Sequence, residues 1–134
     1  MADFIGVLGA TTAVAVGTTT AYTVPTSKAA KVKLMFRGRS GSGGLSTFGV
    51  TVNGVTVFGS ATMAASQEFG SVTGRMLQGP HTTTWFAGAT MDQTIAPGPS
   101  EYYLSAGDLV QVVIAGGDLT SLNFQVVGAE VDAS

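Results

Sequence analysis

Apolar and polar residues alternate in several short segments of this chain, and a period of two is typical of β-strands whose two faces meet different surroundings. The clearest example is residues 28–37, which read Lys-Ala-Ala-Lys-Val-Lys-Leu-Met-Phe-Arg. Here Val32, Leu34 and Phe36 alternate with three basic residues and a methionine. The alternation predicts a half-buried strand with an apolar side in the core and a basic side in solvent.

Turn residues interrupt such segments at intervals of roughly ten residues, as in β-sandwiches and barrels. Asn53 and Gly54 lie between two alternating apolar runs and predict a tight hairpin, because both residues tolerate a positive φ. The Ser- and Gly-rich residues 40–46 are expected to form a flexible loop, and Gly128 a bulge or a close backbone contact. No segment combines a helical period with caps at both ends, so we predict an all-β fold.

The length of 134 residues fits one domain spanning residues 1–134, which is long enough to bury about two-thirds of its unfolded surface. Residues 1–17 are a candidate extended N-terminal arm. The apolar segment inside this arm is expected to add as a strand to a neighbouring protein. Its candidate contact residues are Phe4, Ile5, Val7 and Leu8.

We expect no membrane partner, because no stretch approaches the ~20 consecutive apolar residues of a transmembrane helix. The apolar residues 4–16 lack the preceding basic residues of a secretory signal, and Asp3 lies where positive charge belongs. The protein is therefore expected to be made in the cytoplasm and to reach its site without the usual export route.

Charged residues make up 10% of the chain, whereas ordinary soluble domains have about 25%. Six basic and eight acidic side chains thinly cover the ~6,500 Å² that a monomer of this mass exposes. We infer that part of the surface is buried against other copies or a larger assembly. A monomer coated with Thr and Ser is the alternative. The net charge of -2 gives no general attraction to nucleic acid.

Five of the six basic residues fall within twelve positions. They are Lys28, Lys31, Lys33, Arg37 and Arg39. Five of the eight acidic residues follow residue 100. We expect the basic residues to contact an acidic patch on a neighbouring subunit or on a shell protein; the alternative is a sheet edge protected by lysines. Nucleic acid is not an expected partner, because no aromatic platform accompanies the basic run.

Residues for catalysis or metal binding are scarce, so we predict no enzyme activity, no cofactor and no metal site. The chain has no cysteine and one histidine, His81, which falls in an expected loop with no recognisable nucleophile motif nearby. Its aspartates are isolated, whereas zinc and calcium sites gather several ligands at short spacing. The Gly-rich residues 37–44 lack the Gly-Lys-Ser/Thr that a phosphate-binding loop needs before a helix.

The C-terminal strands carry a resemblance to a known fold family. Residues 102–114 read Tyr-Tyr-Leu-Ser-Ala-Gly-Asp-Leu-Val-Gln-Val-Val-Ile, and residues 123–131 read Asn-Phe-Gln-Val-Val-Gly-Ala-Glu-Val. This pattern resembles the closing strands of trimeric jelly rolls of the C1q and tumour-necrosis-factor type. The resemblance implies an antiparallel β-sandwich of jelly-roll type, with about eight strands, that assembles as a homotrimer.

Three further segments are similar to small structural proteins of tailed bacteriophages. Residues 16–25, 28–36 and 50–57 carry this likeness, as Val-Gly-Thr-Thr-Thr-Ala-Tyr-Thr-Val-Pro, Lys-Ala-Ala-Lys-Val-Lys-Leu-Met-Phe and Val-Thr-Val-Asn-Gly-Val-Thr-Val. Tyr-Tyr-Leu-Ser-Ala-Gly-Asp at residues 102–108 adds to it. The likeness implies a virion protein made in the host cytoplasm: a capsid decoration or cement protein that binds the major capsid protein, or another virion protein, and stabilises the outer shell.

The same resemblance leaves a second role open, that of a receptor-binding or fibre-tip domain for host surface carbohydrate. Its candidate contact residues are Trp85, Tyr102 and Tyr103. Packing of these aromatic residues in a core or at a trimer axis is the structural alternative. A free carbohydrate-binding module would use the same residues.

Overall fold

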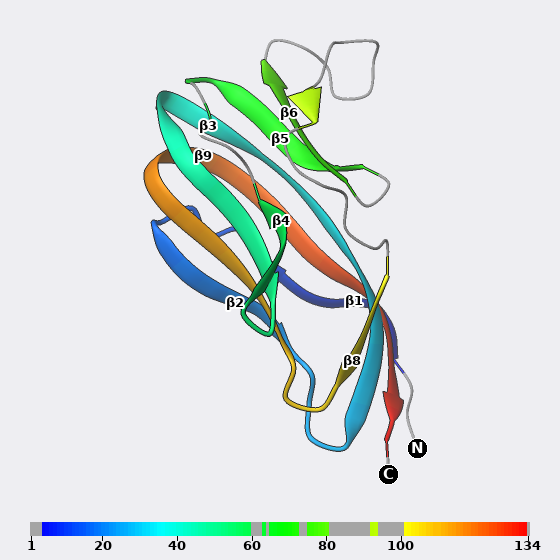
Figure 1. Cartoon of the computed structure of the whole chain (residues 1–134). Coiled ribbons are helices and arrows are strands. Elements are labelled where there is room, and N and C mark those ends of the chain that lie inside the picture. Colours follow the sequence, from blue (N-terminus) through cyan, green and yellow to red (C-terminus); the bar gives the residue numbers. More distant parts are fainter. Residues whose placement is uncertain are drawn as a thin grey trace.

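The chain is all-β and antiparallel, as the sequence predicts. A computed structural model describes residues 4–59, 63, 65–72, 75–80, 92–93 and 101–133 (Figure 1). Within these residues it has nine strands and no helix, and therefore no helix that could cross a membrane. The strands are β1 (Phe4–Thr11), β2 (Gly17–Thr23), β3 (Lys28–Val52), β4 (Val55–Gly59), β5 (Gln67–Val72), β6 (Arg75–Pro80), β7 (Asp92–Gln93), β8 (Tyr102–Ser105) and β9 (Leu109–Asp132). Every pairing between them is antiparallel.

The two longest strands, β3 and β9, pair with each other and bend together (Figure 1). Their ladder joins residues 28–40 of β3 to residues 119–132 of β9. After a change of register at the bend, it joins residues 45–52 to residues 110–117. One continuous sheet therefore folds over on itself, and each long strand contributes to two rows of strands.

We call these the first and second rows. The first row contains β1, residues 119–132 of β9 and residues 28–40 of β3. Strands β8 and β5 follow one another along the far edge of β3, where β8 pairs with residues 29–32 and β5 with residues 37–39. Strands β6 and β7 continue the row beyond β5. The second row contains β2, residues 109–117 of β9, residues 45–52 of β3 and β4.

Aromatic rings join the two rows. The Phe36 ring of the first row lies 5.5 Å from the Phe48 ring and 5.2 Å from the Phe58 ring of the second row, between centroids. Phe48 in turn lies 4.5 Å from Phe69 of β5, and Phe36 lies 5.6 Å from Phe124 of β9. All five side chains are buried. The predicted inward set of Val32, Leu34 and Phe36 is likewise buried, which confirms the alternation along this strand.

The predicted hairpin at Asn53 and Gly54 is present, with φ values of 52° and 80°. The expectation of a flexible loop at residues 40–46 is wrong, because this segment continues β3 through the bend. Ser40 is buried there, and its hydroxyl oxygen accepts a 2.9 Å hydrogen bond from the Gln67 N–H. Small residues are needed at the bend because the paired backbones approach closely.

Residues 4–11 do not form an extended arm, because β1 pairs with β9 of the same chain. This corrects the expectation for that part of residues 1–17: the apolar segment already has a partner strand. Strand β1 also passes close to β2, since a Cβ atom added at Gly9 would overlap the Ala21 carbonyl oxygen. An alternating apolar pattern does not distinguish pairing within a chain from pairing with a neighbour.

Gly128 marks the close backbone contact that the sequence suggests. It pairs with Val32, and a Cβ atom there would overlap the Lys31 carbonyl oxygen and lie 2.9 Å from the Val32 Cα. We expect Gly128→Ala to lower the free energy of unfolding by about 1–3 kcal/mol, because the ladder must shift to admit the methyl group. The urea midpoint at unchanged m-value measures this loss.

Gly49→Ala is the matched control for this substitution. A Cβ atom at Gly49 would meet its nearest neighbour, the Phe58 carbonyl oxygen, at 3.5 Å, which is ordinary van der Waals contact. Its urea midpoint should not fall. Equal midpoints for the two variants would contradict the close contact at Gly128.

Candidate functional site

The side chains of β3 that point away from the core form a basic stripe on the first row. They are, in order, Lys31, Lys33, Met35, Arg37 and Arg39, and all are exposed. Directly paired residues of antiparallel strands point to the same face. We therefore define the outer face of the first row as this stripe together with the side chains that flank it on β1, β5, β8 and β9.

The flanking side chains on β9 carry no charge. Opposite the stripe, in the same order, lie Ala129, Val127, Gln125, Asn123 and Ser121. On the other edge, Tyr103 of β8 pairs with Lys31, and Gly70 and Glu68 of β5 pair with Arg37 and Arg39. The basic stripe thus runs between neutral neighbours for most of its length.

Exposed apolar side chains also concentrate on this face. Seven large hydrophobic residues of the described chain are exposed, and four of them lie on the outer face. These are Val7, Met35, Tyr103 and Val131, with exposed fractions of 49%, 53%, 75% and 43%. Tyr, Met and Arg are enriched where proteins contact other proteins. The outer face shares its exposed Tyr, Met and Arg with protein interfaces, although its two lysines, Lys31 and Lys33, are less typical of them.

Two of the five predicted contact lysines and arginines have partners within the chain. Lys28 forms an ion pair with Asp132, and Lys31 Nζ lies 3.6 Å from Glu101 Oε2 and 5.8 Å from the Tyr103 ring centroid. The other three have no ion pair with any described residue; they are Lys33, Arg37 and Arg39. Lys28 and Lys31, at the start of β3, thus have ion-pair partners, and the three basic residues further along the strand have none among the described residues.

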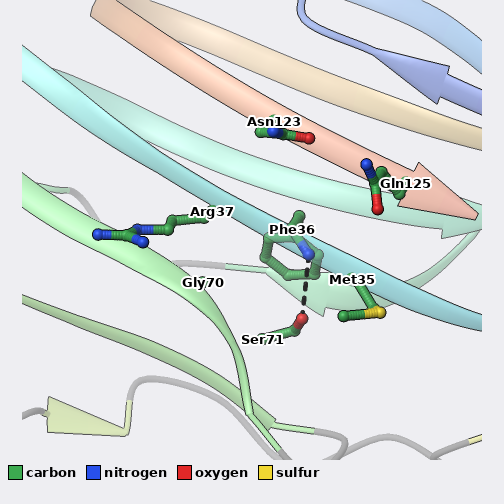
Figure 2. A pocket seen from close by; sticks show the side chains of 7 residues that line it. All are labelled: Met35, Phe36, Arg37, Gly70, Ser71, Asn123 and Gln125. Atoms are coloured by element: carbon green, nitrogen blue, oxygen red, sulfur yellow. Dashed lines mark hydrogen bonds between the residues drawn. The ribbon is translucent and has the colours of Figure 1, made fainter. Parts of the chain in front are cut away.

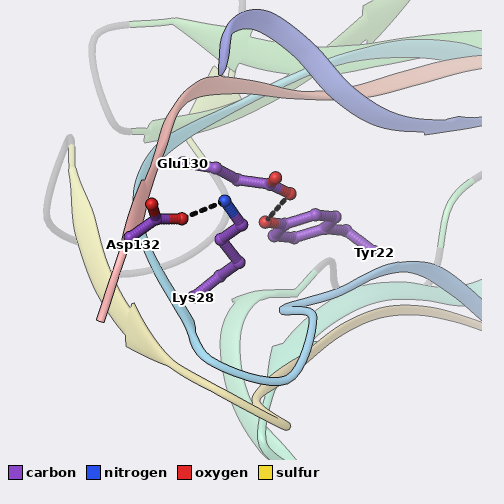
Figure 3. A network of polar contacts seen from close by, with 4 residues as sticks. All are labelled: Tyr22, Lys28, Glu130 and Asp132. Carbon is purple, nitrogen blue, oxygen red and sulfur yellow. Dashed lines mark hydrogen bonds and ion pairs between the residues drawn. The ribbon is translucent and has the colours of Figure 1, made fainter. Parts of the chain in front are cut away.

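The C-terminal acidic residues are mostly engaged inside the chain, which the sequence does not reveal. Beside the Lys28–Asp132 pair, the Tyr22 hydroxyl donates a 2.6 Å hydrogen bond to Glu130 Oε2 (Figure 3). Burial, and then the Glu130 carboxylate, raise the pKa of Tyr22 well above its usual range. The Asp108 carboxylate accepts a 2.8 Å hydrogen bond from the Ser105 N–H. Most of the C-terminal carboxylates thus have a partner within the chain.

Two adjoining hollows lie on the outer face and share Arg37 and Asn123. The first, of about 260 Å³, is lined by Met35, Phe36, Arg37, Gly70, Ser71, Asn123 and Gln125 (Figure 2). The second, of about 300 Å³, is lined by Arg37, Gly38, Arg39, Glu68, Ser121, Leu122 and Asn123. Together they form one groove along β3, between β5 and β9. The groove lines up basic, amide and hydroxyl groups with one carboxylate.

Ser71 holds one wall of this groove in place. Strands β8 and β5 pair with residues 29–32 and 37–39 of β3 and leave the edge between them without a strand partner. The Ser71 hydroxyl fills that gap: its oxygen accepts a 3.1 Å hydrogen bond from the Phe36 N–H, and it donates a 3.3 Å hydrogen bond to the Leu34 carbonyl oxygen. A side chain here replaces one step of the ladder.

The two described candidate carbohydrate residues, Tyr102 and Tyr103, do not share a face of the sheet. Tyr102 and Tyr103 follow each other on β8 and point to opposite faces: Tyr103 is exposed on the outer face, whereas Tyr102 pairs with buried Val32. The Tyr102 hydroxyl oxygen is buried without a hydrogen bond to the described residues, and burial raises its pKa. Trp85 and His81 lie outside the described residues.

The described candidate contact residues of the N-terminal segment, Val7 and Leu8, have different surroundings. Val7 lies on the outer face, and Leu8 packs against the core. Phe4 and Ile5 belong to β1, and the structure describes their backbone but not their side chains. The described residues contain no group of three or more His, Asp or Glu that could hold a metal ion.

Ser71→Ala should reduce the free energy of unfolding by about 1–3 kcal/mol, because it leaves the Phe36 N–H and the Leu34 carbonyl without their partner. Ser121→Ala, an exposed hydroxyl on the same face, should change it by less than about 0.5 kcal/mol. Thermal unfolding of both variants against the parent protein compares the two losses. A Ser71 variant as stable as the Ser121 variant would refute the bridging role.

No known relative indicates a function for the outer face. No protein-family model, no curated protein and no solved structure matches this chain. The function proposed below therefore depends on the residues of the two rows and on what the sequence leads us to expect.

Proposed function

We propose that this protein is a non-enzymatic structural module that attaches through the outer face of the first row to the outer shell of a bacteriophage capsid and stabilises it. One observation carries the proposal: the outer face combines exposed Tyr103 and Met35 with basic side chains that have no ion pair among the described residues. Ordinary surfaces scatter such residues, whereas interfaces gather them. The major capsid protein is the proposed partner.

The dimensions of the outer face suit such a contact. Strands β1, β5 and β8 together with residues 28–40 and 119–132 comprise 45 residues, and at ~3.3 Å per residue and ~4.8 Å between strands they cover an area on the order of 700 Å². Stable interfaces bury ~800 Å² on each partner. The face is therefore large enough to hold the module on a shell, and attachment of several copies would strengthen each weak contact.

The proposal includes a jelly-roll topology. Several consecutive segments lie in different rows: β1 belongs to the first, β2 to the second, and each half of β3 and of β9 to a different row, whereas β5 to β8 all belong to the first. Each row places β9 and β3 side by side at its centre. This arrangement supports a double-sheet jelly roll, and the likeness of the C-terminal strands to trimeric jelly rolls supports it further.

The proposed homotrimer would form through the second row. Its four strands, residues 17–23, 45–52, 55–59 and 109–117, contain no Asp, Glu, Lys or Arg. The outer faces of two first rows would instead bring like charges together, which opposes a contact between identical faces. Copies can therefore associate through the uncharged row and leave the basic face for the shell.

The proposed trimer predicts a mass of about 40 kDa in light scattering, three times the 13.5 kDa of one chain. Thr18→Glu, on an exposed position of β2, should lower the mass because it adds charge to the second row. Thr12→Glu adds the same charge in the exposed connection between β1 and β2, outside both rows, and should leave the mass unchanged. A parent protein of 13.5 kDa at micromolar concentration would overturn the trimer.

Attachment should depend on the unpaired basic residues. We expect the double substitution Arg37→Gln with Arg39→Gln to reduce occupancy on capsids that lack the native protein, and added salt to do the same to the parent protein. Occupancy is measured by sedimentation of the loaded capsids. Lys28→Gln, which removes a lysine paired within the chain, is the control and should reduce occupancy less.

Capsids without the protein should lose resistance to heat while the virions still adsorb to host cells, because the contact stabilises the shell. Normal heat resistance with loss of adsorption would refute the decoration role and favour the receptor-binding alternative.

A further inference from the structure

We propose that the groove along β3 binds an extended acidic segment of the partner polypeptide, with acidic and apolar residues at alternate positions. This inference rests on the proposed attachment role and adds the chemistry of the bound segment. It starts from the order of side chains on the stripe, Lys33, Met35, Arg37 and Arg39, all of which are exposed.

The spacing of the stripe matches that of an extended peptide. Alternate side chains of a β-strand lie ~6.6–6.8 Å apart, so Arg37 and Arg39 are one such step apart and Lys33 is two steps from Arg37. A second extended chain lying along β3 has the same step. Three acidic residues would then meet the three basic ones, and an apolar residue would meet Met35, which is 53% exposed.

The walls of the groove suit a polypeptide better than a polysaccharide. Asn123 and Gln125 line it beside Arg37 (Figure 2), and each amide side chain offers both donors and an acceptor, as a peptide backbone requires. The Phe36 ring is buried in the core, so no exposed aromatic side chain lines either hollow. The exposed Tyr103 ring, which a sugar could stack on, lines a separate hollow of about 430 Å³ beside Lys31 and lies outside this groove.

Glu68 limits the side on which acidic residues of the ligand can lie. It pairs with Arg39 across β5 and β3, and it is the one acidic side chain that lines either hollow among the described residues. Its Oε1 atom is buried without a hydrogen bond to the described residues. An acidic ligand residue displaced from Arg39 toward β5 would be repelled by this carboxylate. The ligand is therefore expected to lie toward β9, whose side chains opposite the stripe carry no charge.

The test uses a labelled peptide, Gly-Glu-Thr-Glu-Thr-Val-Thr-Glu-Gly, titrated into the full-length protein and followed by amide chemical shifts in NMR. We expect saturable shifts confined to residues 33–39, 68–71 and 121–125. A peptide with Gln in place of each Glu should bind at least about tenfold more weakly, because the charge-assisted contacts are lost. A peptide of the same composition with its three Glu consecutive should bind about threefold more weakly or worse, because only alternate residues share a face.

Protein variants locate the contact. Arg37→Gln should weaken peptide binding about fivefold or more, because Arg37 lines both hollows. Thr12→Glu changes the net charge by the same amount in the exposed connection between β1 and β2 and should alter the affinity by less than about twofold, as expected for a screened distant charge. Equal weakening by the two variants would overturn the groove as the binding site.

The outcomes separate this inference from the proposed function. If heparin binds the groove and the alternating peptide does not, the acidic-peptide inference is overturned in favour of an acidic polysaccharide. If the arginine variants lose capsid occupancy while the peptide fails to bind, the inference falls and the attachment role stands. If the peptide binds in the groove and the arginine variants still load capsids fully, the groove chemistry stands and the capsid role falls.

Discussion

Contact between aromatic rings of the two rows is the interaction on which the rest of the structure depends. The Phe36 ring meets the Phe48 and Phe58 rings because β3 and β9 reverse direction together at their bend. The apolar side chains of both rows then point into one interior, as in packed sheets. Among the described residues the buried polar residues are Ser40 and Thr51. Glu130 points to the same side of the sheet as buried Ala30, and its carboxylate accepts a hydrogen bond from the hydroxyl of buried Tyr22.

The bend also places a basic part of the chain and an uncharged part on different faces of the molecule. The first half of β3 carries the basic stripe, and residues 45–52 of the same strand carry no charge. Because the two halves fall in different rows, the basic stripe and the uncharged strands face opposite sides of the molecule. Much of the positive charge is thus concentrated on one face, and the strands of the second row carry none.

The ion pairs of Lys28 and Lys31 add little to the stability of the fold, and their main effect is to neutralise charges at the start of β3. The Lys28 and Asp132 side chains are 24% and 43% exposed, and pairs in such surroundings add little to the free energy of folding. They do, however, join the start of β3 to the end of β9, and they occupy carboxylates that could otherwise neutralise the stripe. Lys33, Arg37 and Arg39 remain without an ion pair among the described residues, and the side chains opposite them on β9 carry no charge.

The sequence by itself determined the local elements. Alternation fixed which side chains of β3 face the core, and therefore that Lys33, Arg37 and Arg39 point to solvent, since that choice depends only on the period of the strand. The pair Asn53 and Gly54 determined the hairpin, because few other residues accept positive φ in succession.

Only the tertiary structure decided what lies beside these elements. The groove needs Asn123 and Gln125, whose positions next to Arg37 and Met35 follow from a ladder between residues far apart in the chain. It also needs Ser71, which reaches the edge of β3 through a side-chain hydrogen bond. The bend at residues 40–46 and the pairing of β1 within the chain depend on the same long-range ladder. Such pairings are set by the packing of the whole core, and a local pattern of residues carries no record of which distant strand will complete it.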